Sequence, residues 1–360
     1  MKFLIKKLAA IAMVSIMILS LTGCGAHKYE NLDENKLLIV TTLFPQYDFA
    51  KHIAGDKAEV VLLLPPGTES HDFEPTPSDI ILINKADLFI YTGDEMEPWV
   101  GTILESIDNE NLNVLDVSDG IELICEEENH EHNHVHEDGQ HEHEDEYAHE
   151  DDEADHSEEH EEEHDEDSHS GESIILGEAE HDHSHTADPH IWTSPVNAIK
   201  MASNIAEALA EFDEENSAFY LDNCDEYTME LEEIDAQFES IVSNSATKTI
   251  YFGGRFAMSY FAREYGLSYV AAFDSCQTES EPSARLIVKI IEKMREDKAR
   301  YVFYEEMTDP KAARIIAEEI GGEILLLHSC HNVSKSEMES GVTYLSLMKQ
   351  NVENLRKALD

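Results

Sequence analysis

The feature that most constrains this chain is a regular alternation of short apolar, β-rich runs with longer segments of helical character. The predicted strands are residues 37–43, 58–64, 87–91, 111–117, 247–253, 267–273, 300–306 and 323–327. Strands that alternate with helices favour parallel sheets with helical crossovers, and continuous apolar runs fit strands covered on both faces. The sequence therefore predicts an α/β fold with two lobes, each a parallel sheet flanked by helices.

The helical segments divide the chain further. Thr76-Pro77-Ser78-Asp79 has the N-cap, first-turn proline and first-turn acid that open a helix. A segment of about 30 residues, 214–243, has no glycine or proline and repeats apolar residues at helical spacing. Such a helix can join two lobes as a rigid strut. The remaining predictions are helices at 195–211, 255–265, 282–296, 310–320 and 336–359, an N-terminal lobe at 37–212, a linking helix at 213–244 and a C-terminal lobe at 245–360.

Residues 126–187 form an insert of different composition. They hold 27 Asp and Glu, no Lys or Arg, and 14 of the 20 histidines. Such a segment cannot bury a core, so we expect disorder when it carries no ligand. Alternating imidazoles can converge on one metal ion, which predicts a metal collector or a sensor of zinc sufficiency; the alternative is a solvated acidic loop. The expected collectors are His130, His132, His134, His136, His181, His183 and His185.

The N-terminus predicts export. Basic residues precede an apolar run of 15 residues, 8–22, which is shorter than the roughly 20 needed to span a bilayer. The run ends in Leu21-Thr22-Gly23-Cys24, which resembles a bacterial lipobox. We expect a signal peptide at 1–23, a lipid on Cys24 and a tether at 24–36, with a signal anchor as the alternative. The protein would then be extracytoplasmic and lipid-anchored to the bacterial cell membrane. The net charge of −54 argues against a nucleic-acid partner.

Two motifs place a histidine where a ligand would bind. Gly67-Thr68-Glu69-Ser70-His71-Asp72-Phe73-Glu74-Pro75 follows the second predicted strand, and ligands in open α/β sheets bind beyond the carboxyl ends of strands. Asp188-Pro189-His190-Ile191-Trp192 opens a helix, with an aspartate that could orient the imidazole. Either histidine alone could be an ordinary loop residue.

Together these motifs resemble the metal-binding solute-binding lipoproteins of zinc/manganese ABC importers, and among them the zinc-uptake branch. Glu281-Pro282-Ser283, Tyr344-Leu345-Ser346 and the His-rich insert strengthen the resemblance, which covers roughly 37–359. It implies a monomeric receptor that is no enzyme, binds one Zn²⁺ between its lobes and delivers it to an ABC permease. His71 and His190 match family ligands, and Mn²⁺ is the less favoured cargo.

The sequence departs from the family pattern at the third ligand, because Arg255 stands where relatives have a histidine. A guanidinium carries no lone pair for a metal. We expect His328 after the last strand to replace it, with His331, Glu281 or Cys276 as weaker candidates. An alternative role for Cys276 is a disulfide with Cys330, as exported proteins permit. The pairing of Cys125 and Cys224 stays open.

Other functions are less well supported by the sequence. A manganese or iron receptor would need more carboxylate ligands. A zinc hydrolase would need an open coordination position and a general base, and no HExxH helix, Gly-x-Ser-x-Gly elbow or phosphate loop is present. A surface lipoprotein that buffers metal or adheres to a host partner, without coupling to transport, is the remaining alternative.

Overall fold

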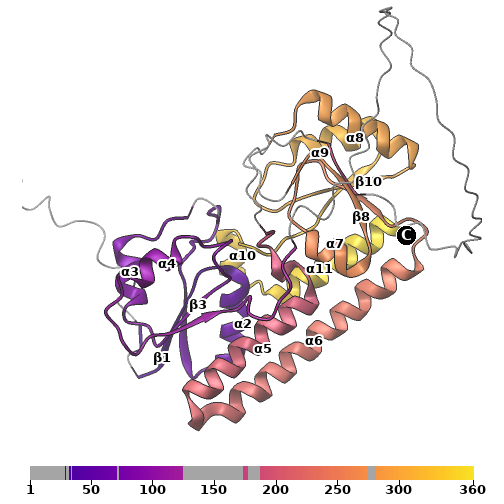
Figure 1. The fold of residues 1–360 in the computed structure, drawn as a ribbon. Helices are drawn as coiled ribbons and strands as arrows, with labels where there is room; N and C mark the ends of the chain where they lie inside the picture. The colour runs from indigo at the N-terminus through magenta and orange to yellow at the C-terminus, as the bar shows by residue number, and fades with distance from the viewer. Residues whose placement is uncertain are drawn as a thin grey trace, which may run out of the picture.

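The computed structural model describes residues 29, 32–33, 35–70, 73–124, 173–176, 187–274 and 281–360. It has two α/β lobes that lie above a pair of long helices (Figure 1). No helix among the described residues combines the length and apolar character that crossing a bilayer requires.

The N-terminal lobe contains one parallel sheet, as predicted. Its strands are β1 (Leu37–Thr41), β2 (Ala58–Leu62), β3 (Leu88–Tyr91) and β4 (Asn113–Asp116), in the order β2-β1-β3-β4. The helices are α2 (Phe44–Ala54), α3 (Pro77–Ile83) and α4 (Val100–Leu104). Thr76 caps α3 through its hydroxyl, which accepts the Asp79 backbone N–H, as the sequence predicted.

The C-terminal lobe is also built from parallel strands. In the first group β8 (Ser268–Ala271) lies between β5 (Ile174–Ile175) and β6 (Thr249–Tyr251). A bridge from Phe252 to Phe303 continues this group to β10 (Tyr301–Tyr304), which pairs with β11 (Glu323–Leu326). The remaining elements are the pair β7 (Arg255–Phe256) and β9 (Phe273–Asp274), and the helices α7 (Ser259–Tyr265), α8 (Ala284–Glu296) and α9 (Lys311–Ile320).

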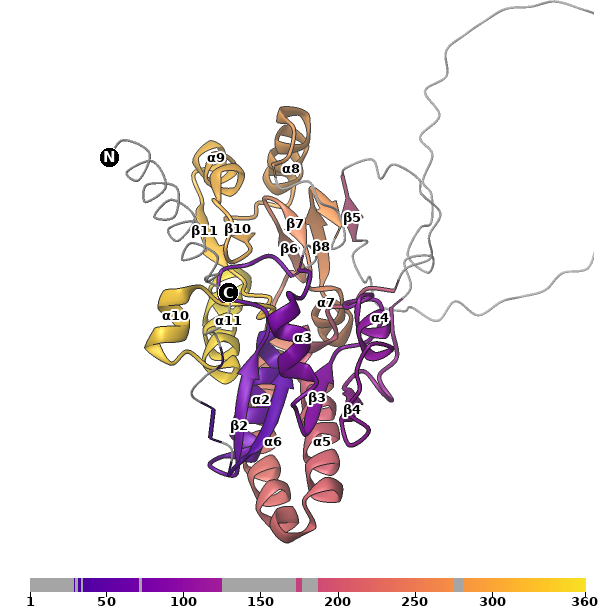
Figure 2. The same ribbon diagram turned by 90° about the vertical axis from the view of Figure 1, so that its left-hand side faces the viewer.

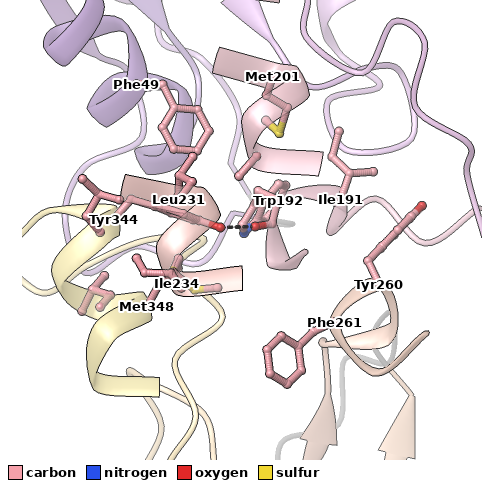
Figure 3. Close-up of a cluster of buried hydrophobic side chains, with 14 of the residues drawn as sticks. Phe49, Ile191, Trp192, Met201, Leu231, Ile234, Tyr260, Phe261, Tyr344 and Met348 are labelled. Carbon is pink, nitrogen blue, oxygen red and sulfur yellow. Dashed lines mark hydrogen bonds between the residues drawn. The ribbon is translucent and has the colours of Figure 1, made fainter. Parts of the chain in front are cut away.

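Two long helices join the lobes. The short 3₁₀ turns η2 (Ile191–Thr193) and η3 (Glu214–Asn216) precede α5 (Pro195–Phe212) and α6 (Ser217–Asn244), respectively. In Figure 1, α6 runs beneath both lobes. One apolar cluster is continuous from the N-terminal lobe through α5 and α6 to the last helix. Trp192 is fully buried in it, and the Tyr344 hydroxyl donates to its carbonyl at 2.5 Å (Figure 3).

A single buried carboxylate ties three helices together at this junction. Asp48 of α2 accepts a hydrogen bond from the Tyr227 hydroxyl of α6 at 3.1 Å. The same oxygen accepts the backbone N–H of Tyr344, the first residue of the last helix, at 3.0 Å. The lobes are thus joined by polar contacts as well as by apolar packing.

Three sequence predictions need correction. The predicted helix 255–265 begins only at Ser259, as α7, because Arg255 and Phe256 form the strand β7 that pairs with β9. The predicted closing helix 336–359 is two helices, α10 (Lys335–Ser340) and α11 (Tyr344–Leu359), because Gly341 ends the first in the left-handed region and Thr343 caps the second. The insert is also not wholly outside the fold. Ile174 and Ile175 form β5, which pairs with β8 at an edge of the C-terminal sheet (Figure 2).

Candidate metal site

Three loops meet where the lobes face each other, and they carry or adjoin the motifs singled out in the sequence. The loop before His71 contacts the loop after β11: Gly67 donates its N–H to the Val333 carbonyl at 2.8 Å. The amide of Asn332 donates to Thr68 O at 2.8 Å. The loop around His190 joins them, because the Trp192 indole donates to Ser329 O at 2.8 Å. Segments far apart in sequence are therefore fixed together at the junction.

The ring of His190 is held by a carboxylate. Its Nδ1 lies 2.8 Å from Asp188 Oδ1, and the same oxygen accepts the His190 backbone N–H. Burial alone would raise the pKa of Asp188, but the neighbouring imidazole and these hydrogen bonds lower it. The carboxylate therefore stays ionised and accepts a proton-bearing Nδ1, which leaves the lone pair of the neutral ring on Nε2. This is the arrangement that metal-binding histidines have in proteins.

A second imidazole is prepared in the same way in the C-terminal lobe. His331 Nδ1 lies 3.3 Å from Glu306 Oε1 and 3.1 Å from the Ser329 hydroxyl. Burial would lower the pKa of His331, but the hydrogen bond and charge of Glu306 outweigh it and raise that pKa. In the neutral ring the lone pair lies on Nε2, a buried atom without a hydrogen-bond partner. His331 is thus ready to accept a cation.

His328 has the opposite ring orientation. Its Nδ1 accepts the backbone N–H of Cys330 at 2.9 Å, so this nitrogen carries no proton. The proton of the neutral ring then sits on Nε2, which cannot donate a lone pair to a metal. Nε2 is buried and has no hydrogen-bond partner. The two sequence candidates of this loop thus differ in the ring nitrogen that keeps a lone pair in the neutral form: Nε2 in His331 and Nδ1 in His328.

Arg255 connects two carboxylates across the junction. Its Nε and Nη2 both lie 3.3 Å from Glu305 Oε2, and Nη2 lies 3.8 Å from Glu69 Oε2 in the N-terminal lobe. The other oxygen of each carboxylate, Oε1, is buried and has no hydrogen-bond partner. Glu69 Oε1 lies 3.7 Å from His331 Nε2. Burial raises the pKa of Glu305, although the Arg255 charge opposes this.

Other predicted site residues lie elsewhere. Glu281 is 73% exposed and pairs with Lys311 on the surface, so it does not contribute to this junction. Cys330 is a free buried thiol next to Met348 Sδ, so the structure does not contain a disulfide to Cys276. Outside the described residues lie His71, Cys276, Cys24 and the insert histidines His130, His132, His134, His136, His181, His183 and His185.

The described part of the site is incomplete. Among the described residues, no group of three His, Cys, Asp or Glu side chains is close enough to hold a metal ion. The loop that carries His71 enters the junction through Ser70, which is buried. The insert also begins and ends nearby, because the Asp188 N–H donates to the Ile124 carbonyl at 2.9 Å.

Three acidic residues of the junction escaped the sequence analysis. Glu69 was visible within the His71 motif, and Glu305 and Glu306 directly follow the strand β10, the position where ligands of parallel sheets gather. Their adjacency to His331 depends on the pairing of β10 with β11, which the sequence does not specify.

This fold and junction define the class of two-lobed solute-binding receptors, which serve transporters and are not enzymes. Within that class, the chain belongs to the family described as zinc-uptake complex component A, periplasmic, which matches residues 39–358. The resemblance drawn from the motifs is thereby confirmed.

Individual relatives agree with this assignment. The chain is 31% identical to the high-affinity zinc uptake system protein ZnuA of Bacillus subtilis, with 98% of both chains covered. It is 30% identical to the zinc-binding protein AdcA of Streptococcus pyogenes, but spans only 57% of that longer protein. The solved metal-dependent lipoprotein YcdH of Bacillus subtilis has a TM-score of 0.67 at 29% identity, covering 90% of this chain and 99% of that one.

Proposed function

We propose that this protein is a zinc receptor outside the cytoplasmic membrane that delivers the ion to an ABC importer. The observation that carries the proposal is the pair of buried imidazoles, His190 and His331, whose Nδ1 atoms face carboxylates from opposite sides of one junction. Each leaves Nε2 to accept a cation. The relatives named for zinc uptake and zinc binding support the choice of ion.

The proposed ligands are His71, His190 and His331. This set keeps the two histidines of the sequence motifs and replaces His328, whose Nδ1 accepts a backbone N–H, by its neighbour three residues on. Three imidazoles suit Zn²⁺, whereas Mn²⁺ prefers carboxylate and water oxygens. Among the described residues no third donor joins His190 and His331, and in this proposal His71 supplies it.

Calorimetry with Zn²⁺ tests the site directly. We expect the mature protein to bind one ion tightly and further ions more weakly, with the weaker class belonging to the insert. A deletion of 126–172 should keep the tight ion; it ends before β5, so that the strand pairing with β8 survives. Loss of the tight ion in this deletion would refute the junction site.

Substitution of single ligands refines this test. His190→Ala and His71→Ala should each lower the zinc affinity by more than about 100-fold, because even partners outside the ligand shell are worth 10–100-fold. A control is His52→Ala: this histidine lies on α2 and contacts Asp48 and Tyr227, not the proposed ligands. Unchanged affinity in both ligand variants would contradict the proposed function.

The membrane tether is a separate proposal. Cleavage before Cys24 and lipidation of its sulfur would hold the receptor at the membrane beside its permease. A Cys24→Ala variant should appear in the culture medium or in the soluble extracytoplasmic fraction, while the parent protein fractionates with membranes. Membrane retention of the variant would favour the signal-anchor alternative.

A further inference from the structure

In two carboxylates of the junction, one oxygen is paired with a guanidinium and the other has no partner. Glu69 and Glu305 both direct Oε2 at the guanidinium of Arg255, and both leave a buried Oε1 without a partner. A buried carboxylate oxygen without a hydrogen bond is costly, so such atoms in a native site call for a missing cation or donor. Arg255 itself cannot supply it, because it already faces the opposite oxygens.

One of these oxygens lies at ligand spacing from a prepared imidazole. Glu69 Oε1 and His331 Nε2 are 3.7 Å apart, too far for a hydrogen bond, and neither has another partner. Two ligands of one tetrahedral Zn²⁺, with bonds of about 2.0–2.2 Å, are separated by about 3.4 Å. A small contraction would therefore place one ion between these two atoms.

We propose that Arg255 is a positioning residue that replaces the missing histidine indirectly, by presenting Glu69 Oε1 as the fourth ligand of the zinc site. Glu305 orients the guanidinium through its Nε and Nη2, and the guanidinium holds Glu69 Oε2. The carboxylate is thereby limited to one free oxygen, which faces His331. In the zinc-bound form, Glu69 Oε1 and His331 Nε2 would both bind the ion; the described residues bring no third donor to this pair. This inference rests on the proposed zinc function, to which it adds Glu69 as a ligand and Arg255 as the residue that positions it.

The arrangement also bears on ion selectivity. Ions such as Mn²⁺ bind preferentially to carboxylate and water oxygens, often with higher coordination numbers. A guanidinium that occupies Oε2 prevents Glu69 from chelating through both oxygens and adds a fixed positive charge nearby. Without Arg255 the lost positive charge would by itself favour a cation, but Glu69 Oε1 would no longer be held toward His331, so we expect Zn²⁺ binding to weaken. With both Glu69 oxygens free to chelate, the preference for Zn²⁺ over Mn²⁺ should narrow.

A double-mutant cycle tests the proposal. We expect Glu69→Gln and Arg255→Gln each to lower the Zn²⁺ affinity by about 10–100-fold, the range found for outer-shell partners. If Arg255 acts through Glu69, the double variant should bind no more weakly than Glu69→Gln alone. Losses that multiply in the double variant would overturn the proposal, as would wild-type affinity in either single variant.

Cobalt provides a second readout that a merely structural role would not change. The visible spectrum of Co²⁺ bound in place of zinc reports the number and type of ligands. The spectra of Glu69→Gln and Arg255→Gln should shift in the same way. Arg255→Lys keeps a charge beside Glu305 but lacks the planar fork, so it should fold and still show the shifted spectrum. A wild-type spectrum in this folded variant would refute the positioning role.

Matched controls come from exposed ion pairs of the same lobe. Glu323→Gln removes a carboxylate paired with Lys357, and Arg314→Gln removes a guanidinium paired with Asp309. Both should bind Zn²⁺ like the parent. His190→Ala separates the two levels of argument: if it abolishes tight binding while Glu69→Gln does not, the inference fails and the zinc function stands. If His190→Ala also binds normally, the zinc site itself is wrong.

Discussion

Glu97 in the N-terminal lobe and Glu306 in the C-terminal lobe are both buried beyond the carboxyl ends of strands, and their carboxyl groups have opposite pKa shifts. Burial raises the pKa of Glu97, in the N-terminal lobe, to about 8. Burial acts in the same direction on Glu306, in the C-terminal lobe, but the electrostatic influence of the neighbouring His328 and His331 rings and hydrogen bonds from His331 and Ser329 bring its pKa well below the usual value. Equal burial thus gives a protonated group in one lobe and an ionised group in the other.

The neighbours explain the difference. Glu97 lies among the Thr42 hydroxyl, the Thr92 backbone N–H and Gln46, all of which are neutral. A protonated Glu97 can donate to Thr42, whose hydroxyl donates onward to Gln46 Oε1 at 2.9 Å. Glu306 instead faces two imidazoles. The comparison shows that the neighbours of a buried carboxyl group, and not burial alone, decide whether its pKa is raised or lowered.

The largest expected effect concerns the imidazole that Glu306 orients. His331→Ala should lower the Zn²⁺ affinity by more than about 100-fold, because it removes a direct ligand supported by Glu306. His328→Ala should change the affinity by less than about 10-fold and act mainly on stability, since it removes a buried ring bonded to the Cys330 N–H. Titration calorimetry and thermal unfolding of both variants measure this. The reverse order of affinities would restore His328 as the ligand.

Next in size is the effect of removing the charge of Glu306. Glu306→Gln should lower the Zn²⁺ affinity by about 10–100-fold, since an amide orients His331 less firmly than a carboxylate does. Asp188→Asn should have an effect of similar size through His190. Affinity is measured by competition with a chelator of known strength. A Glu306→Gln protein that binds zinc like the parent would show that the charged carboxylate is irrelevant.

The smallest effect is expected for the neutral glutamate. Glu97→Gln should leave zinc affinity unchanged and stabilise the protein at pH 7 by an amount on the order of 1 kcal/mol. The reason is that the unfolded chain releases the proton of Glu97 above about pH 4.3, whereas the folded protein retains it until about pH 8. The free energy of unfolding of the wild-type protein therefore decreases as pH rises from about 4.3 to about 8.

Denaturant unfolding of the metal-free protein across pH 4–9 measures this last effect. Relative to the parent, Glu97→Gln should have a smaller decrease in free energy of unfolding with rising pH. Parallel curves for the two proteins would mean that Glu97 is ionised in the folded state and that the two lobes do not differ in the way described.

The contrast between the lobes also shows what sequence could predict. The Asp188–His190 pair lies within one short loop, so its chemistry was readable from neighbouring residues. The Glu306–His331 pair joins the ends of two strands, and its existence depends on the register of β10 and β11. The tautomer of His328 depends on one backbone N–H at Cys330, a residue with a φ of 65°, which no sequence pattern indicates.

The secondary structure, too, was predictable where a signal lay within a short stretch of sequence. The apolar runs predicted the longer strands of both lobes, but not the two-residue strands β5 and β7, because burial on two faces leaves a direct imprint only in longer runs. The break at Gly341 and the strand at Ile174–Ile175 were also visible, as a glycine before a capping threonine and as an apolar run in an acidic segment. The stronger signals of helical periodicity and acidic composition masked them.

The three-way contact of Asp48 has a mechanical consequence for transport. The Asp48 carboxylate is hydrogen-bonded to helices of both lobes. Breaking these hydrogen bonds would leave the buried carboxyl group, or the N-terminal end of α11, without a partner. These contacts therefore oppose large rotations of one lobe relative to the other. Under the proposed function, the zinc-loaded and empty forms would then differ mainly in a few surface loops around the site, and a docking permease would distinguish the two forms by the conformation of those loops.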